Sequence, residues 1–475
     1  MGLVETVNVF FVGALVLWAF IPNQTVREYV WPIRGEEWYK FLPMGALMLC
    51  ILFNYSTFRA VKDALVVNGI DARAIPFVKL GFVLPASVLI VMLYIFLLNL
   101  FGNLMAFYII SAGFILYFLF FVFYVSPAPE VFEISIESID VFVRVIEYTV
   151  YNLMFYVDFS SIGFVNIILN IILNLAILMV IRTIVVNFVL GAECASWFFN
   201  FIYIFIFVFG LYGYLYSEYV DNTTGIVQLS EHVPVLGLIQ KIISKWTYVV
   251  FYILSELFGV LYIGFFFWAK ANQDTLKTET KRFYPAFGII GNVGPILTGQ
   301  ISSFTLYNKI MLTILSFIVL IILYTYISSR SYLYEEEVAK ETGGSTASVK
   351  KKPKLSVGES ISMVFNSRQL LLIASLVIAY GTTMILLEGV WKYNIKLYTQ
   401  GNIDAYSGFM GYVLGLQGVA AAILLIIGAN ILKYVSWTVA ALITPVIMIG
   451  TGFILLLLAY LCDMPDVIAV IMDFL

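Results

Sequence analysis

Long apolar segments, separated by short polar connections, dominate the pattern along the chain. A membrane-spanning helix needs about 20 mostly apolar residues. The segments that approach or exceed this length are 41–58, 75–101, 104–125, 162–190, 197–216, 246–268, 283–304, 310–327, 370–387, 408–432 and 437–461. A shorter apolar run covers 7–21, and another begins at Val467 and stops at Leu475, within an element. The pattern predicts an all-α, polytopic membrane protein.

A long polar stretch at 329–369 interrupts this pattern. It holds an acidic run at 335–337 and a lysine cluster at 350–354. Such a composition is typical of a flexible, solvated linker, and the lysines would also suit anionic lipid. Two helical bundles joined by a charged linker are the plan of many secondary transporters. We therefore predict an atypical N-terminus at 1–24, an N-terminal bundle at 25–328, a cytoplasmic linker at 329–369 and an incomplete C-terminal bundle at 370–475.

The composition agrees with a lipid environment. Hydrophobic residues make up 62% of the 475 residues and charged residues only 12%, whereas a soluble domain has about 25% charged residues. Lysine and arginine gather in the stretch 23–40, before Phe283, in the linker and at Lys433. Alternating crossings from residue 41 onward place all of these on one side of the membrane. The positive-inside rule makes that side cytoplasmic.

Several classes of chemistry are excluded or unsupported. His232 is the single histidine, so a multi-histidine metal site is excluded, and the three cysteines lie far apart. No GxxxxGK[ST] phosphate loop occurs in the chain. We expect no metal, no cofactor, no nucleic-acid partner and no enzymatic activity.

Charges inside apolar segments are expensive and therefore mark candidate functional residues. Arg59, Lys62 and Asp63 follow the apolar segment 41–58. If that helix continues to about residue 67, the three charges lie within the bilayer; if it ends at residue 58, they form a solvated loop. In the first case Arg59 and Asp63, at i and i+4, can neutralise each other, which leaves Lys62 as a spare positive charge for a phosphate or carboxylate.

Two carboxylates stand out in later segments. Glu256 lies in the middle of 246–268, where it needs a partner, a proton or water. Glu388 lies four residues before Lys392, so the two can form a simple ion pair near a helix end or serve a functional site. Small residues also recur at helical spacing, at 288, 291 and 294 and at 408, 411, 415 and 418. These two glycine faces favour close helix packing or sliding.

Longer motifs carry a resemblance to a known family. They are WPIRGEEWYKFLP (31–43), FNYSTFRAVKDALVV (53–67), KWTYVVFYILSELFGVLYIGFFFWAKANQ (245–273), KRFYPAFGIIGNVG (281–294), IAYGTTMILLEGVWKYNIKLY (378–398) and GANILKYVSWTVAALITP (428–445). Together they resemble the ATP/ADP translocases of plastids and of obligate intracellular bacteria such as rickettsiae and chlamydiae. The resemblance covers about 25–143 and 226–465.

The resemblance implies a fold similar to the major facilitator superfamily and an exchange of ATP for ADP that imports host ATP. It implies a place in the inner membrane of an obligate intracellular bacterium, with inorganic phosphate as a further candidate substrate. Family charges important for transport map onto Lys62, Glu256 and Glu388, the residues already selected from their positions. Tyr55 is a candidate to stack on adenine.

The sequence departs from the family at 1–24, in an apolar insert at 144–225 and in the helices missing after Leu475. Two alternatives therefore stay open. The protein could be a proton-coupled nucleotide symporter in which Glu256 or Glu388 carries the proton, or a truncated membrane protein that does not transport.

Overall fold

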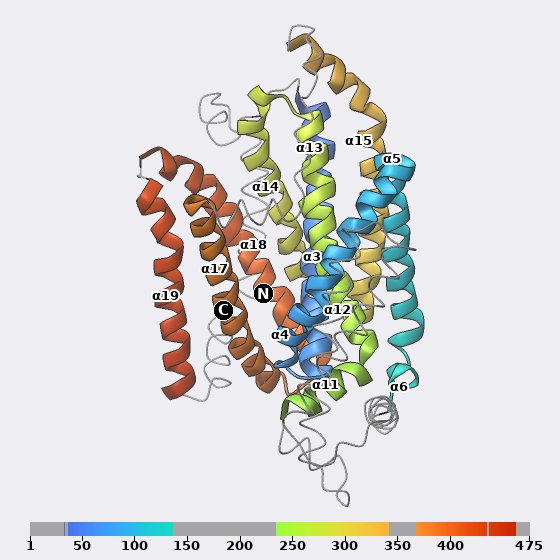
Figure 1. Ribbon diagram of the computed structural model, residues 1–475, viewed down its shortest axis with the longest axis vertical. Helices are drawn as coiled ribbons and strands as arrows, with labels where there is room; N and C mark the ends of the chain where they lie inside the picture. The colour runs from blue at the N-terminus through green and yellow to red at the C-terminus, as the bar shows by residue number, and fades with distance from the viewer. Residues whose placement is uncertain (1–32, 34–36, 136–233, 342–366, 435–436, 462–475) are drawn as a thin grey trace, which may run out of the picture. The chain divides into compact units, whose positions relative to one another are not determined.

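The computed structural model of the protein describes residues 33, 37–135, 234–341, 367–434 and 437–461 (Figure 1). The predicted apolar segments at 7–21, 162–190, 197–216 and after 467 lie outside these residues. The chain divides into two compact units, Met1–Phe132 with Lys245–Leu475 and, separately, Glu133–Ser244. In the second unit, α11 (Pro234–Ser244) ends at Ser244, whose hydroxyl donates a 2.7 Å hydrogen bond to the carbonyl of Ile134.

The regular structure in the described part of the first unit is helical, and no strand occurs among its described residues. Its elements are α3 (Trp38–Gly69), α4 (Ala74–Val78), η2 (Lys79–Val83), α5 (Leu84–Phe120), η3 (Phe121–Val125), α6 (Pro129–Phe132), α12 (Trp246–Phe258), η4 (Gly259–Phe267), α13 (Trp268–Asp274), α14 (Lys277–Gln300), α15 (Leu306–Glu341), α17 (Arg368–Tyr398), α18 (Ile403–Tyr434) and α19 (Trp437–Leu461). The η elements are π-helices.

Five of the described helices are long and apolar enough to cross a membrane: Trp38–Gly69, Ala74–Val125, Trp246–Asp274, Leu306–Arg330 and Ile403–Leu425. A shorter apolar helical stretch covers Leu442–Ile454. The prediction of an all-α, polytopic membrane protein is therefore confirmed.

The helix boundaries differ from the apolar segments in two informative places. The segments 75–101 and 104–125 form one helical run that is broken at Gly102, where φ is 79° and ψ is 173°. Only glycine adopts such a backbone without strain. In addition, α15 continues to Glu341, well into the stretch predicted to be a linker.

The helix that begins at Trp38 continues through the charged residues 59–63. Helix α3 continues without a break to Gly69, so Lys62 and Asp63 lie inside a candidate membrane span and are buried. The solvated-loop interpretation is therefore wrong. Backbone groups in lipid must be satisfied internally, which favours continuing the helix through these charges over opening a loop.

Aromatic packing fixes the rotation of the helices that carry these charges. The ring of Phe58 on α3 stacks on Phe118 of α5 at 4.2 Å between centroids and meets Phe258 of α12 edge-on at 5.4 Å. Phe258 in turn packs edge-on against Phe317 of α15. Because Phe58 lies one turn before Lys62 and Phe258 lies two residues after Glu256, this core orients both charged residues.

Glycine faces hold α14 against its two neighbours, α3 and α18. A Cβ atom added to Gly415 on α18 would lie 2.9 Å from the Cα of Gly299 on α14. On the other side of α14, a Cβ on Gly291 would lie 2.8 Å from atoms of Leu52 and Met48. The glycine faces therefore do pack helices closely.

We expect the substitution Gly415→Ala to destabilise the protein by about 1–3 kcal/mol, since the added methyl group meets backbone that cannot rotate away. The matched control is Gly113→Ala on α5, where an added Cβ meets no atom within 4 Å. There the better helix propensity of alanine should leave stability unchanged or raise it by up to about 1 kcal/mol. Thermal unfolding of the purified proteins in detergent measures both; equal melting temperatures for the two variants would contradict the close approach.

Candidate functional site: a buried charge cluster

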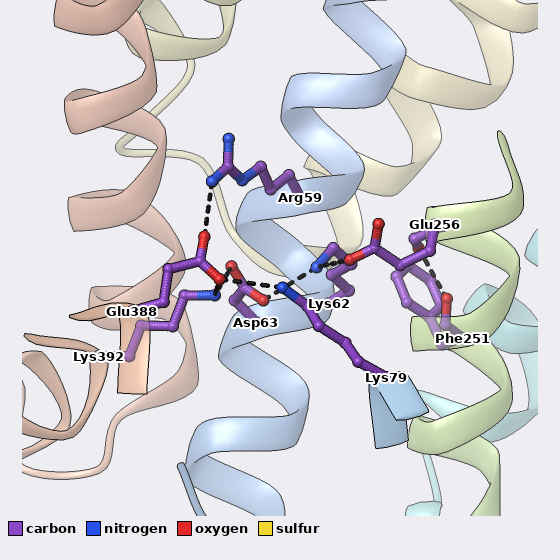
Figure 2. A network of polar contacts seen from close by, with 9 residues as sticks. Arg59, Lys62, Asp63, Lys79, Phe251, Glu256, Glu388 and Lys392 are labelled. Carbon is purple, nitrogen blue, oxygen red and sulfur yellow. Dashed lines mark hydrogen bonds and ion pairs between the residues drawn. The ribbon is translucent and has the colours of Figure 1, made fainter. Parts of the chain in front are cut away.

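Ionised side chains from separate helices converge at one place in the first unit. We call them the charge cluster, and Figure 2 shows them together. Its members are Arg59, Lys62 and Asp63 of α3, Lys79 of η2, Glu256 of α12, and Glu388 and Lys392 of α17.

One half of the cluster is centred on Lys62. Its ammonium nitrogen lies 2.9 Å from Oε1 of Glu256 and 3.1 Å from Oδ1 of Asp63. The second oxygen of Asp63 lies 2.9 Å from Nζ of Lys392. Lys62, Asp63 and Lys392 are all at most 2% exposed, so these pairs join α12, α3 and α17 deep inside the protein.

The other half is centred on Glu388. Its Oε1 accepts a 2.9 Å hydrogen bond from Nη2 of Arg59, and its Oε2 lies 3.0 Å from Nζ of Lys79. Lys392, four residues further along α17, approaches the same oxygen at 3.5 Å. Three cations thus share one carboxylate, and Arg59 and Lys79 remain partly accessible.

The cluster carries an excess of positive charge. Four cations (Arg59, Lys62, Lys79, Lys392) and three anions (Asp63, Glu256, Glu388) give 4 − 3 = +1. Burying such ions costs several kcal/mol each before pairing, and a buried ion pair is often no more stabilising than apolar packing. Ionisable groups retained within membrane helices therefore indicate function rather than stability, and this cluster is suited to a polyanion.

The pairing differs from the sequence-based expectation. We expected Arg59 to neutralise Asp63 and Lys62 to be left spare. Instead Arg59 pairs with Glu388, while Lys62 is paired with both Asp63 and Glu256. The expected Glu388–Lys392 contact is present, yet the shorter contact of Lys392 is to Asp63. Local spacing cannot show this, because the partners come from helices that are distant in sequence.

Sequence reasoning missed Lys79. It lies within the apolar segment 75–101, so the criterion that selected Glu256, a charge inside an apolar run, would have found it as well. The loop at 70–73 brings Lys79 back towards α3.

The carboxyl of Asp71 in this loop has a pKa below its ordinary value. Partial burial raises that pKa, but the hydrogen bonds from Arg73 lower it by more.

Two of the π-helices border the cluster. η2 begins at Lys79 itself, and η4 begins at Gly259, three residues after Glu256. The wider turn of a π-helix shifts the register of the side chains that follow, and such turns are frequent at functional sites.

Tyr55 packs next to the start of η4. A Cβ atom added to Gly259 would lie 2.6 Å from Cε2 of Tyr55, so the tyrosine ring packs directly over this glycine. The role of Tyr55 in stacking on adenine stays a prediction.

A cavity of about 700 Å³ lies elsewhere, where the connection between α14 and α15 meets the connection between α17 and α18. Hydroxyl and aromatic side chains line it, and Asp404 is the charged residue among them. Since Asp404 is an anion, this cavity does not suit a polyanion, and the charge cluster is the stronger candidate.

Buried ionised side chains among apolar helices that can span a membrane are typical of polytopic membrane transporters. The chain belongs to the TLC ATP/ADP transporter family, whose sequence profile matches residues 21–158 and 158–473. The resemblance to ATP/ADP translocases is confirmed.

The chain is similar to named carriers of rickettsiae. It is 30% identical to ADP,ATP carrier protein 1 of Rickettsia bellii (strain RML369-C) over 444 residues, which cover 90% of this chain and 70% of the relative. It is 31% identical to ADP,ATP carrier protein 3 of the same strain over 456 residues, or 90% of this chain and 73% of the relative. No solved structure matches the chain. Both relatives are named as ADP,ATP carriers.

Proposed function

We propose that this protein exchanges ATP for ADP across a membrane by alternating access around the charge cluster. The observation that carries the proposal is the buried cluster itself, in which every cation is already held by a carboxylate. A nucleotide polyphosphate is the solute that can compete with three carboxylates at once, through charge-assisted hydrogen bonds to arginine and lysine.

The pairing pattern supports exchange over simple uptake. Arg59–Glu388 and Lys392–Asp63 connect α3, in the proposed N-terminal bundle, with α17, in the proposed C-terminal bundle. Rocking one bundle against the other separates these pairs, and separating buried ions without a replacement is costly. The empty carrier is therefore held in place, and a bound nucleotide supplies the replacement charge that lets it move.

This mechanism assigns each group a role. Lys62 and Arg59 receive the phosphate oxygens, with Lys79 and Lys392 adding to the positive field. Glu256, Glu388 and Asp63 hold the cations while the site is empty. In the same proposal, the protein lies in the inner membrane of an obligate intracellular bacterium, imports host ATP, and accepts inorganic phosphate as a smaller anion.

The test is uptake of labelled ATP into intact cells that express this chain, followed by a chase with excess unlabelled ADP. We expect uptake, rapid release of label on the chase, and no effect of a protonophore. Collapse of uptake by the protonophore would instead identify proton symport, with Glu256 or Glu388 carrying the proton. Absence of uptake by protein confirmed in the membrane would identify a protein that does not transport.

A further inference from the structure

Two buried tyrosines stand next to the charge cluster on helices that flank α3. Tyr252 lies on α12, one turn before Glu256, and the ammonium of Lys62 lies over its ring, 3.9 Å from the centroid. Tyr406 lies in the first turn of α18, a helix that packs against α3, and it is within electrostatic range of Asp63, Lys62 and Glu388. Both side chains are completely buried, with 0% exposure.

Neither hydroxyl has an acceptor for its hydrogen within the part of the chain that the structure describes. The ammonium of Lys62, which lies beside the hydroxyl of Tyr252, can only donate and is already held by Glu256 and Asp63. A buried hydroxyl without a partner loses its bonds to water and gains nothing in return. Nor is this a general feature of the phenols in this fold. Away from the cluster, the hydroxyl of Tyr262 bonds to Ser111 at 2.6 Å, that of Tyr108 to Thr325 at 2.7 Å, and that of Tyr117 to the carbonyl of Thr247 at 2.9 Å.

The contrast between the two groups of tyrosines indicates what the unpaired hydroxyls are for. Where a phenol serves packing, the fold supplies a partner; where it borders the charges, the partner is missing. Such an arrangement is costly in the empty protein and favourable only when a ligand supplies acceptors. Since the surrounding charge is net positive, the acceptors that fit are the oxygens of an anion.

Resting on the function proposed above, we propose that Tyr252 and Tyr406 are hydroxyl donors to the phosphate oxygens of the transported nucleotide. They engage these oxygens as the phosphates displace the carboxylates from Lys62 and Arg59. Lys62 covers one face of the Tyr252 ring, so a substrate that enters the cluster would meet the hydroxyl of Tyr252 and could not stack on that face. The two residues stand on α12 and α18, one in each proposed bundle, so a phosphate chain held by both couples the bundles.

The substitutions Tyr252→Phe and Tyr406→Phe test the proposal, because phenylalanine keeps the ring and removes only the hydroxyl. We expect each to raise KM for labelled ATP by about tenfold to a hundredfold, as expected for losing a hydrogen bond to a charged group. The Ki of inorganic tripolyphosphate, which has no base or ribose, should rise in parallel. The preference for ATP over GTP should stay unchanged.

Thermal unfolding of the purified, nucleotide-free proteins supplies a readout that a structural role would not give. Removing an unpaired hydroxyl should leave the melting temperature of the two nucleotide-free variants unchanged or raise it. The increase in melting temperature on adding ATP should be smaller for these variants than for the wild type. The control Tyr262→Phe leaves Ser111 without its partner, so it should lower the melting temperature and keep the KM of the wild type.

The outcomes separate the two proposals. If the wild type neither transports ATP nor is stabilised by it, the proposed function fails and this inference fails with it. If the wild type responds to ATP and both tyrosine variants respond equally well, only the inference is overturned. A changed preference between ATP and GTP, with an unchanged Ki for tripolyphosphate, would also overturn the inference, because the hydroxyls would then contact the base and not the phosphates.

Discussion

Replacing Lys62 with glutamine is expected to reduce nucleotide exchange on the order of a hundredfold. Lys62 is the partner of both Glu256 and Asp63, so the substitution removes a cation from partly exposed Glu256 and leaves buried Asp63 with Lys392 alone. The net charge of the cluster falls from +1 to zero, and the charge-assisted hydrogen bond to phosphate, worth about 1.5–3 kcal/mol, is lost. Uptake of labelled ATP, normalised to the amount of protein in the membrane, measures the effect.

A matched control exists on the same helix. Lys40 lies near the other end of α3 and pairs with Glu279 at 2.9 Å, and it is as deeply buried as Lys62. Breaking either pair should destabilise the fold, by about 3–5 kcal/mol for a buried pair. Only Lys62→Gln should strongly reduce exchange by the protein that does reach the membrane. Equal exchange by the two variants would show that Lys62 has no special role.

The substitution Glu388→Gln should have a different signature: tighter binding with slower exchange. Glu388 holds Arg59, Lys79 and Lys392 in the empty site. Without its charge the cluster has a net charge of +2, and phosphate no longer competes with this carboxylate. A unit charge within several ångströms is worth a few kcal/mol at an effective dielectric constant of about 20, so we expect ATP affinity to rise about tenfold or more.

Slower release of the tightly held nucleotide should then reduce the exchange rate. Equilibrium binding to purified protein and exchange in proteoliposomes separate the two effects. Glu279→Gln is the control, since Glu279 pairs with Lys40 away from the cluster. Weaker ATP binding by Glu388→Gln would contradict the idea that this carboxylate and the phosphates compete for the same cations.

The two predictions together describe how a buried ion-pair network can serve transport. Ion pairs of this kind contribute little net stability, but they set how much energy the empty carrier needs to rearrange. A bound polyanion supplies negative charge to the freed cations and so lowers the energy that the rearrangement needs. The coupling between the bundles therefore depends on how the carboxylates and cations are paired across them. The presence of the charges alone would not produce it.

The sequence by itself determined the membrane class, most of the described helices and most of the charged candidates. Insertion into lipid depends on apolar length, which is a local property, and a charge in an apolar run is visible because its burial is costly. The family resemblance also rests on linear motifs. Lys79 meets the same local criterion, because it lies inside the apolar segment 75–101.

The tertiary structure alone decided how the charges are paired and which polar groups are left without partners. Arg59 meets Glu388, and Asp63 meets Lys392, across more than 300 positions of sequence. Their meeting depends on the rotation of each helix, which is fixed by aromatic packing, by close glycine contacts and by the π-turns beside Lys79 and Glu256. A sequence likewise does not show that the hydroxyls of Tyr252 and Tyr406 are unpaired, because this depends on all the groups that surround each hydroxyl in the folded protein.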